Sequence, residues 1–330
     1  MKKQFTCIRR NFPTRVGFLI ILLMVNGLLY AQRDSTGKNQ ATQAQARVRP
    51  VKNTFNSQWI IDNQTVMVPV KGTLELDFQH RFGTVTTGYQ DFWGFFSPSF
   101  NIRLGVTYSF MKNLSVGIGV TKTGLTWDGN VKYALLTQTP GKSPVSVTFF
   151  GDWAINTLKD PTLYDGSPIQ HSTDRYTFFS SLIIARKITD KFSAQATVSW
   201  SHQNAVGGYY TKNDSTGTAI YESMYHDHFA IAVSAKYSVT PLSAIIVDYN
   251  QPLTVHPAYN PHPSIGFGYE VTTSGHCFQF FLTNYTWLNP QNNNMYNQNN
   301  PFAYTDNGTG THYPGGEWVI GFNLTKLWNY

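Results

Sequence analysis

The residues best suited to chemistry are histidines in two stretches of the chain. His226 and His228 flank Asp227, and His256 and His262 lie beside prolines further along. On an extended strand, residues two apart share a face, so His226 and His228 would point the same way. Imidazole and carboxylate groups are ligands that transition metals accept. The spacing fits no specific metal-binding template, so we expect neither a metal nor another cofactor.

A second pair of reactive types is Ser201 followed directly by His202. Neighbours on a strand point to opposite faces, so this serine and histidine cannot act on each other as nucleophile and base. The chain also contains no G-x-S-x-G, HExxH or phosphate-cradling glycine motif. We therefore expect no enzymatic activity and no catalytic residue.

A third set consists of charged residues within segments that alternate between apolar and polar side chains. As candidates for lining a barrel lumen we take Glu75, Asp77, Arg81, Arg103, Lys132, Asp152, Lys236, Asp248, Glu270 and Glu317. The first four fall on two neighbouring segments and would form an ionic ladder. Such mixed charge either selects small polar solutes or merely neutralises itself inside a filled barrel.

The elements that must position these charges repeat with a period of two. In residues 72–82, Leu74, Leu76 and Phe78 alternate with acidic or amide side chains. Residues 99–110 and 114–122 continue the pattern over six and four apolar positions. Strict alternation is the signature of β-strands with one apolar and one polar face.

Nine further segments bring the number of predicted strands to twelve. They lie near residues 131–138, 145–156, 175–188, 192–201, 227–239, 243–250, 264–272, 276–287 and 316–328. Short connections alternate with mostly long ones, which is typical of transmembrane barrels with short periplasmic turns and long external loops. The polar QNNNMYNQNN tract in the last long connection is expected to be solvated and mobile.

Alternation alone also fits a soluble barrel with its apolar face inward. Three features favour a membrane. The strands run about nine to thirteen residues, near the ~9–11 needed to cross a bilayer at a tilt. Only 13% of residues are charged. Aromatic residues gather near strand ends, at Phe82, Tyr108, Phe110, Trp153, Tyr176, Trp200, Tyr237, Trp318 and Trp328. We predict an all-β, transmembrane antiparallel barrel over residues 72–330.

The net charge of +7 would suggest nucleic acid, but five positive charges lie in residues 1–31, which leaves +2 for the remainder. That region has a basic start and a 15-residue apolar core, Val16–Tyr30, and is predicted to be a cleaved signal peptide. Cys7 would leave with it, so Cys277 has no partner for a disulfide in the mature chain. We expect export to the outer membrane and no nucleic-acid partner.

Residues 32–50 are polar and aperiodic, and are predicted to be a disordered linker. Residues 51–71 mix apolar and polar groups and would form a plug, a cap or an extra strand. Small residues on polar strand faces leave room for either a water path or this inserted segment; they are Gly117, Gly119, Ala230, Ala232, Gly266 and Gly268.

Several stretches resemble a family of membrane-bound β-barrel domains of Gram-negative bacteria. They include His80-Arg81-Phe82-Gly83, Asn101-Ile102-Arg103-Leu104-Gly105 and Asn113-Leu114-Ser115-Val116-Gly117, with further similarity near Gly275 and Leu282. The resemblance spans about Thr54 to the C-terminus and implies the fold and compartment, but no reaction or ligand.

The sequence therefore predicts a passive pore or transporter for a small polar solute. The alternative is a closed scaffold or binding barrel whose external loops recognise a ligand or partner. Expected partners are outer-membrane lipid and the outer-membrane assembly machinery, which the aromatic C-terminal strand (Trp328-Asn329-Tyr330) would engage.

Overall fold

A computed structural model describes residues 49–212, 219–256, 260–305 and 312–329. The predicted signal peptide, most of the predicted linker and Tyr330 lie outside these residues. The chain divides into two compact units. One comprises Pro50–Ala303 and Pro314–Tyr330, and the other comprises Met1–Arg49 and Tyr304–Tyr313. Of the second unit, the structure describes the hairpin of β16 (Tyr304–Thr305) and β17 (His312–Tyr313).

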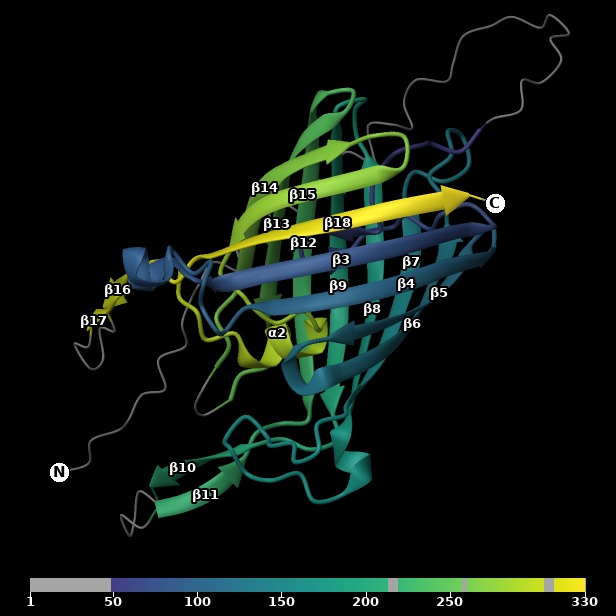
Figure 1. Cartoon of the computed structure of the whole chain (residues 1–330). Coiled ribbons are helices and arrows are strands. Elements are labelled where there is room, and N and C mark those ends of the chain that lie inside the picture. Colours follow the sequence, from purple (N-terminus) through teal and green to yellow (C-terminus); the bar gives the residue numbers. More distant parts are fainter. Residues whose placement is uncertain (1–48, 213–218, 257–259, 306–311, 330) are drawn as a thin grey trace, which may run out of the picture. The chain divides into compact units, whose positions relative to one another are not determined.

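The larger unit is a closed antiparallel barrel of twelve strands (Figure 1). In chain order these are β3 (Thr73–Thr84), β4 (Asn101–Met111), β5 (Leu114–Thr121), β6 (Thr126–Leu136), β7 (Ser146–Asn156), β8 (Tyr176–Lys187), β9 (Phe192–Gln203), β12 (Asp227–Thr240), β13 (Ser243–Pro252), β14 (Ser264–Thr272), β15 (His276–Thr283) and β18 (Val319–Asn329). Each strand pairs with its neighbours in this order, and β18 pairs with β3 to close the barrel.

The predicted strand number and antiparallel barrel are confirmed. The predicted bounds differ most in three places. β6 begins at Thr126 rather than near residue 131, β15 ends at Thr283 rather than near 287, and β18 begins at Val319 rather than near 316. In β6, Gly129 interrupts the outward apolar positions between Trp127 and Val131, so the start of that strand carries a weak periodic signal.

The short and long connections lie at opposite ends of the barrel. β4 and β5 are joined by two residues, Lys112 and Asn113, and β12 and β13 by Pro241 and Leu242. We call this end the short-turn end and the opposite one the loop end. Thr73 pairs with Asn329, so the first and last strands also begin and finish at the short-turn end.

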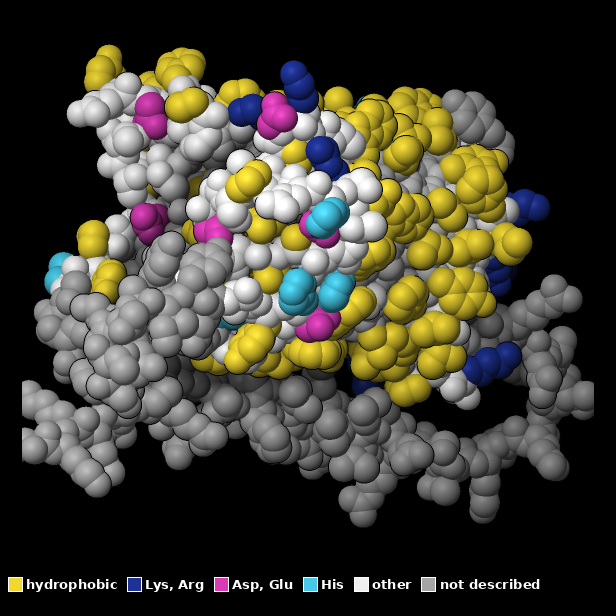
Figure 2. All heavy atoms as spheres, turned by 90° about the horizontal axis from the view of Figure 1, so that it is seen from below, with side chains coloured by type: hydrophobic (Ala, Val, Ile, Leu, Met, Phe, Trp, Pro, Cys, Tyr) yellow, Lys and Arg dark blue, Asp and Glu magenta, His cyan; other side chains and the backbone are white. Residues whose placement is uncertain are grey.

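The apolar face of the strands points outward. In β4, Leu104, Val106 and Tyr108 are exposed, whereas Arg103 and Ser109, on the alternate face, are buried. Figure 2 shows apolar side chains gathered over one part of the barrel surface, beside a more polar region. A surface of this kind suits hydrocarbon, where side chains on the outer face meet acyl chains. The predicted orientation of the two strand faces is confirmed.

Smaller elements occupy the connections and the N-terminal part of the larger unit. They are β1 (Trp59–Ile60), β2 (Asn63–Gln64), the 3-10 turns η1 (Val85–Asp91), η2 (Thr123–Leu125) and η3 (Ser172–Arg175), β10 (Gly208–Lys212), β11 (Ala219–Ser223) and the helix α2 (Pro290–Tyr296). None of the helices in the described part of the chain is long and apolar enough to span a bilayer. Cys277 is a buried free cysteine of β15.

The outward face gives a direct test of membrane contact. Ile118 lies in the middle of β5 and is 54% exposed. Replacing it with arginine should lower the free energy of unfolding in lipid vesicles by about 2–4 kcal/mol, because a charge would then face hydrocarbon. Denaturant titration of vesicle-embedded protein measures this change. The matched variant Ile118→Leu should unfold near the wild-type midpoint, and equal midpoints for the two variants would contradict the outward orientation.

Candidate functional site

The candidate site is the interior of the barrel, where most of the predicted charged residues lie. Nine of them are at most 8% exposed: Glu75, Asp77 and Arg81 on β3, Arg103 on β4, Lys132 on β6, Asp152 on β7, Lys236 on β12, Asp248 on β13 and Glu270 on β14. Glu317 precedes β18, is partly exposed, and accepts a hydrogen bond from the backbone N–H of Asn300 (2.5 Å).

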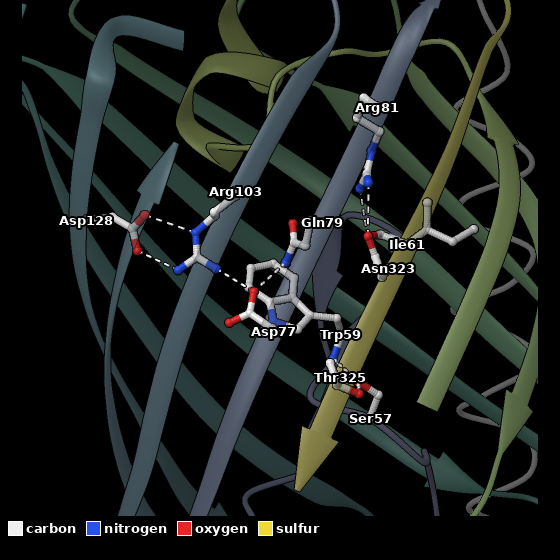
Figure 3. Close-up of polar contacts among 10 residues, drawn as sticks. All are labelled: Ser57, Trp59, Ile61, Asp77, Gln79, Arg81, Arg103, Asp128, Asn323 and Thr325. Carbon is white, nitrogen blue, oxygen red and sulfur yellow. Dashed lines mark hydrogen bonds and ion pairs between the residues drawn. The ribbon is translucent and has the colours of Figure 1, made fainter. Parts of the chain in front are cut away.

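Arg103 is the centre of a buried ion network (Figure 3). Its Nε and Nη2 donate to the two carboxylate oxygens of Asp128 at 2.9 and 2.6 Å, and its Nη1 donates to Asp77 Oδ1 at 2.7 Å. Gln79 Nε2 also donates to Asp77. A fork-shaped guanidinium suits such a two-point contact with a carboxylate. One cation therefore serves two carboxylates, one on β3 and one on β6.

The predicted ionic ladder is present only in part. The network also contains one residue, Asp128, that the prediction missed. Asp77 and Arg103 pair as an ion pair, but Arg81 donates to Asn323 Oδ1 and to the backbone carbonyl of Ile61 instead. Asp128 was not among the predicted residues because the strand was expected to begin near residue 131. If the alternation of β6 is continued toward the N-terminus, Trp127 faces outward and Asp128 faces the interior, which would have identified Asp128.

Glycines beside Arg103 make room for its side chain. A Cβ at Gly119 would overlap the Arg103 guanidinium, and one at Gly105 would overlap both Arg103 and the Asp77 carboxylate. On β5, Gly119 therefore accommodates the Arg103 side chain, and Gly117 accommodates Thr107 and the Asn130 amide, so neither glycine lines an open path. Gly266 has a related role, because a Cβ there would lie 3.0 Å from Ile61 Cγ2.

Ile61 belongs to residues 51–71, which we call the inner segment. Its residues 53–66 make hydrogen bonds with side chains that point inward from many strands. These wall partners are Arg81, Lys132, Thr148, Gln195, Lys236, Asp248, Asn250, Glu270, Gln279, Asn323 and Thr325. The inner segment therefore lies within the ring of strands.

Both ends of the inner segment are held at the short-turn end. The Val51 N–H donates to the carbonyl of Gln138, which follows β6, and the Gly72 N–H donates to Ser109 near the end of β4. Between these points the chain turns back on itself through the pairing of β1 with β2, and Ile61 at the turn has φ of 57°. The segment is thus a loop that enters and leaves through the same rim.

Apolar side chains of the inner segment form a small core with the wall. Its members, all buried, are Phe55, Ile60, Ile61, Val66, Phe150, Phe179, Ile183, Ala185, Ile246, Phe281 and Tyr285. Burial of these groups stabilises the inserted position by removing apolar surface from water. The inner segment is therefore held by both apolar packing and hydrogen bonds.

The asparagine-rich tract enters the interior from the loop end, so the prediction that it is solvated was wrong. α2 covers Pro290–Tyr296, and Gln291, Asn293 and Met295 are at most 1% exposed. Gln291 Nε2 donates to Asp152 and Thr177, and Asn293 Nδ2 donates to Asp62 and the Trp287 carbonyl. Amides pack here because the inward strand faces supply polar partners that an apolar core would lack.

Little space remains around the ion network. A cavity of about 10 Å³ is lined by residues that include Gln58, Asp77, Arg103, Asn130 and Lys132. Such a volume holds about one water molecule. The inner segment supplies part of its lining, together with the wall.

The structure brings together two of the four loop histidines. His228 Nε2 and His256 Nε2 are 2.7 Å apart, and His256 Nδ1 accepts a bond from the Tyr225 N–H. Because His256 Nδ1 accepts a hydrogen bond, its Nε2 carries the ring hydrogen and donates it to the lone pair of His228 Nε2, so both rings are neutral. His226 Nδ1 instead contacts the Gln203 carbonyl. Within the described ranges no three histidine, cysteine or acidic side chains form a metal-binding group.

Ser201 and His202 lie on opposite faces of β9, as expected for strand neighbours. Ser201 is 1% exposed and faces the interior, whereas His202 Nδ1 lies 2.8 Å from Asp227 Oδ1. His80 stacks between Phe100 and Phe322 on the outer face, with interplanar angles of 2° and 3°. These histidines therefore serve packing and local hydrogen bonding.

Comparison with known sequences gives a family for this barrel. The family described as "Membrane bound beta barrel domain (DUF5777)" matches residues 55–328. The chain belongs to this family. No curated protein matches its sequence. The family match runs from the inner segment, which lies within the barrel, to β18, and it places the barrel in a membrane.

Solved structures that this chain resembles include two porins and one outer-membrane channel. The NanC porin has a TM-score of 0.42 at 8% identity, covering 78% of this chain and 99% of its own. The KdgM porin scores 0.40 at 7% identity, with coverage of 76% and 98%. The COG4313 outer membrane channel from Pseudomonas putida F1 scores 0.40 at 8% identity, with coverage of 79% and 97%.

The ion network predicts a large loss of stability when its cation is removed. Arg103→Met should lower the free energy of unfolding by about 3–5 kcal/mol, because two buried carboxylates lose their partner. Replacing all three members, as Asp77→Asn, Arg103→Met and Asp128→Asn, should cost less, since no charge remains unpaired. Denaturant unfolding in vesicles measures both. The exposed control Lys159→Met should resemble wild type, and equal stability of Arg103→Met and this control would contradict the prediction.

The histidine pair predicts an acid-sensitive loop. Burial lowers the pKa of His256 from its ordinary value of 6.5, so the folded state favours the neutral ring. A group with a lowered folded pKa contributes stability that is present above the unfolded pKa and is lost as the pH falls below it. A nitroxide on Val255→Cys should therefore gain mobility as the pH falls below about 6.5, measured by electron paramagnetic resonance.

The matched variants separate this pair from other histidines. His256→Gln should abolish the pH dependence of the Val255 label, whereas His171→Gln, at the N-cap of the η3 turn, should leave it unchanged. A label whose mobility stays constant as the pH falls from 7.5 to about 4 in the otherwise unaltered protein would show that the pair does not hold the loop.

Proposed function

We propose that this protein is a gated passive pore of a Gram-negative outer membrane that admits a small polar solute, with the inner segment as its gate. The supporting observation is the chemistry of the wall behind that segment. The side chains that contact it include Arg81, Lys132, Lys236, Asp248 and Glu270, all buried and all charged types. These charged side chains can make hydrogen bonds with water as well as with the inner segment.

The energetic argument concerns the cost of burying charge. Apolar side chains of similar volume often replace a buried ion network with no loss of stability, or even a gain. A barrel filled permanently would therefore gain little from charged walls around an inserted loop. Charged and amide walls are favourable when they face water in some state of the protein, and mixed charge across a lumen selects small polar solutes.

The path of the inner segment is compatible with movement. Because Val51 and Gly72 are both held at the short-turn end, the segment can withdraw as a loop without threading an end through the barrel. Its hydrogen bonds with the wall can be exchanged for bonds with water, which makes their net contribution modest. The apolar core around Ile61 and Phe281 is then the main force that keeps the gate closed.

The remaining features complete the proposal. Residues 1–31 act as a cleaved export signal and residues 32–50 as a linker. The outward apolar face contacts outer-membrane lipid, and the last strand carries the aromatic signal for the outer-membrane assembly machinery. No catalytic role, cofactor or nucleic-acid partner is proposed.

The second candidate is a closed scaffold or binding barrel. It is favoured by the filling of the interior from both ends, where Asn293 of α2 donates to Asp62 of the inner segment at 2.8 Å. In that case the lumen charges neutralise one another, and the connections at the loop end recognise a ligand or partner. The two candidates differ in whether an ionic current ever crosses the barrel.

A reversible cross-link between gate and wall separates them. The hydroxyl oxygens of Ser57 and Thr325 are 3.4 Å apart, so Ser57→Cys with Thr325→Cys should form a disulfide, made in a background lacking the two native cysteines. Planar-bilayer recordings should show no current when this pair is oxidised and step openings after reduction. Replacing residues 53–66 by a Gly-Ser linker of equal length should raise the open probability at least tenfold.

The control cross-link lies within the wall. Thr240 and Ser243 flank the β12–β13 turn with their hydroxyl oxygens 2.7 Å apart, so a disulfide there does not involve the inner segment and should leave conductance unchanged. Current through the oxidised Ser57–Thr325 pair would show that the segment is not the gate. A sealed bilayer for every variant, the linker replacement included, would support the closed scaffold.

A further inference from the structure

The connection between β3 and β4 carries a cluster of exposed aromatic rings. We call residues 85–97 the aromatic loop; it begins with η1 at the loop end of β3 (Figure 1). Tyr89 and Phe96 are 82% and 79% exposed, and Phe92, Trp93 and Phe95 are between 37% and 47% exposed. Five large aromatic side chains on one short connection are unusual for a surface that meets only water.

The rings of the aromatic loop are continuous with the outward face of the barrel. Phe82, the last outward aromatic residue of β3, lies 4.4 Å from Phe95 between ring centroids. From Phe95 the contacts pass to Phe92 at 5.8 Å and from Phe92 to Trp93 at 5.4 Å. In the other direction, ring contacts run from Phe82 through His80, Phe322, Phe78 and Phe100. One aromatic surface therefore extends from the strands to the loop.

The loop is held in a defined conformation. The Gly94 N–H donates to Asp91 Oδ1 at 2.8 Å, the Trp93 N–H donates to the Gly88 carbonyl at 2.6 Å, and the Gly83 N–H donates to the Gly94 carbonyl at 2.9 Å. Gly94 has φ of 85°, and a Cβ there would overlap the backbone of Gly83. This close approach ties the loop to the end of β3.

Two bulky residues of the loop adopt a costly backbone conformation. Phe92 and Trp93 have φ of 53° and 54°, in the left-handed region that large side chains rarely occupy. Such strain persists only where the surroundings enforce it, and it gathers at functional positions. In this conformation both rings are partly exposed and contact other aromatic residues of the loop.

The charge of this region also suits an apolar partner. Between Phe82 and Phe100 the sequence contains one charged residue, Asp91, whose carboxylate binds the loop backbone. A cation lies beside this surface: Lys122 Nζ is 3.5 Å from the centre of the Phe100 ring and donates to the carbonyls of Pro98 and Phe100. Tyrosine and tryptophan rings favour the boundary between hydrocarbon and headgroups, where lysine can reach polar groups.

From these observations we propose that the aromatic loop inserts into the outer leaflet of the membrane and extends the lipid-facing surface of the barrel beyond the end of β3. Its occupant is lipid, and the continuity of its rings with the lipid-facing strands is the main argument for that choice. The insertion anchors one side of the barrel at a fixed depth. It does not depend on whether the inner segment acts as a gate.

Nitroxide labels measure the depth of the loop in full-length protein reconstituted into vesicles. Single cysteines at Tyr89→Cys and Phe96→Cys, in a background lacking the native cysteines, place labels on the two most exposed rings. Both should relax faster with oxygen, which concentrates in lipid, than with a water-soluble nickel complex. Lys159→Cys, on the β7–β8 connection, is the matched control and should show the reverse order.

The outcomes separate lipid from the alternatives. A label at Ile118→Cys, on the middle of β5, sets the value for full lipid exposure, and both loop labels should lie nearer to it than to the Lys159 label. Nickel accessibility at Tyr89 and Phe96 equal to that at Lys159 would overturn the proposal. Shielding of both loop labels from oxygen and nickel alike would indicate a protein partner and would also overturn it. Disrupted folding is recognised separately by loss of the heat-dependent shift in electrophoretic mobility.

Discussion

The structure depends on one constraint, which is that the polar faces of twelve strands must find partners in a single narrow interior. Lipid outside the barrel requires apolar side chains there, and the period of two then turns every alternate residue inward. Arg81, Arg103 and Lys132 are among the residues that this geometry buries. Because an unpaired buried charge is costly, the contents of the lumen must be polar as well as space-filling.

Two insertions meet this requirement from opposite ends. The inner segment offers backbone carbonyls, such as those of Gln58 and Ile61, to wall cations and amides. α2 offers amide side chains, whose two donors and one acceptor suit carboxylates and hydroxyls alike. The insertions meet where Asn293 donates to Asp62. A tract that is too polar for an ordinary core is therefore well matched to the inside of a membrane barrel.

The same interior combines strong and weak attachments. The network of Asp77, Arg103 and Asp128 lies within the wall itself and holds β3, β4 and β6 together. The inner segment is attached by hydrogen bonds to neutral and charged groups and by a modest apolar core. Arg103 also contacts the inner segment, since its guanidinium carbon lies 5.5 Å from the centre of the Trp59 ring. The ion pairs of the network join wall residues only, so the proposed withdrawal of the segment would leave them in place. On the outer surface, the proposed lipid contact of the aromatic loop is separate from the ion network and from the inner segment.

The sequence by itself determined the barrel. Alternation is a local property, so residues 99–110 or 114–122 identify a strand and its two faces without knowledge of any partner. The connection lengths gave the two ends of the barrel, and the inward direction of nine charged residues followed from the same period. Where the period was interrupted, as at the start of β6, Asp128 was missed. The local pattern was sufficient because each strand must present apolar side chains to lipid at alternate positions, whatever its neighbours are.

Only the tertiary structure decided what fills the barrel. The contacts of Asn56 with Glu270 and of Ser57 with Thr325 join residues more than 200 positions apart, and no local pattern encodes them. The burial of Gln291 and Asn293 contradicted composition, since solvation was the expected state of so polar a tract. Whether a polar side chain faces water or a polar wall depends on which distant groups surround it, and closure of the barrel alone fixes those groups.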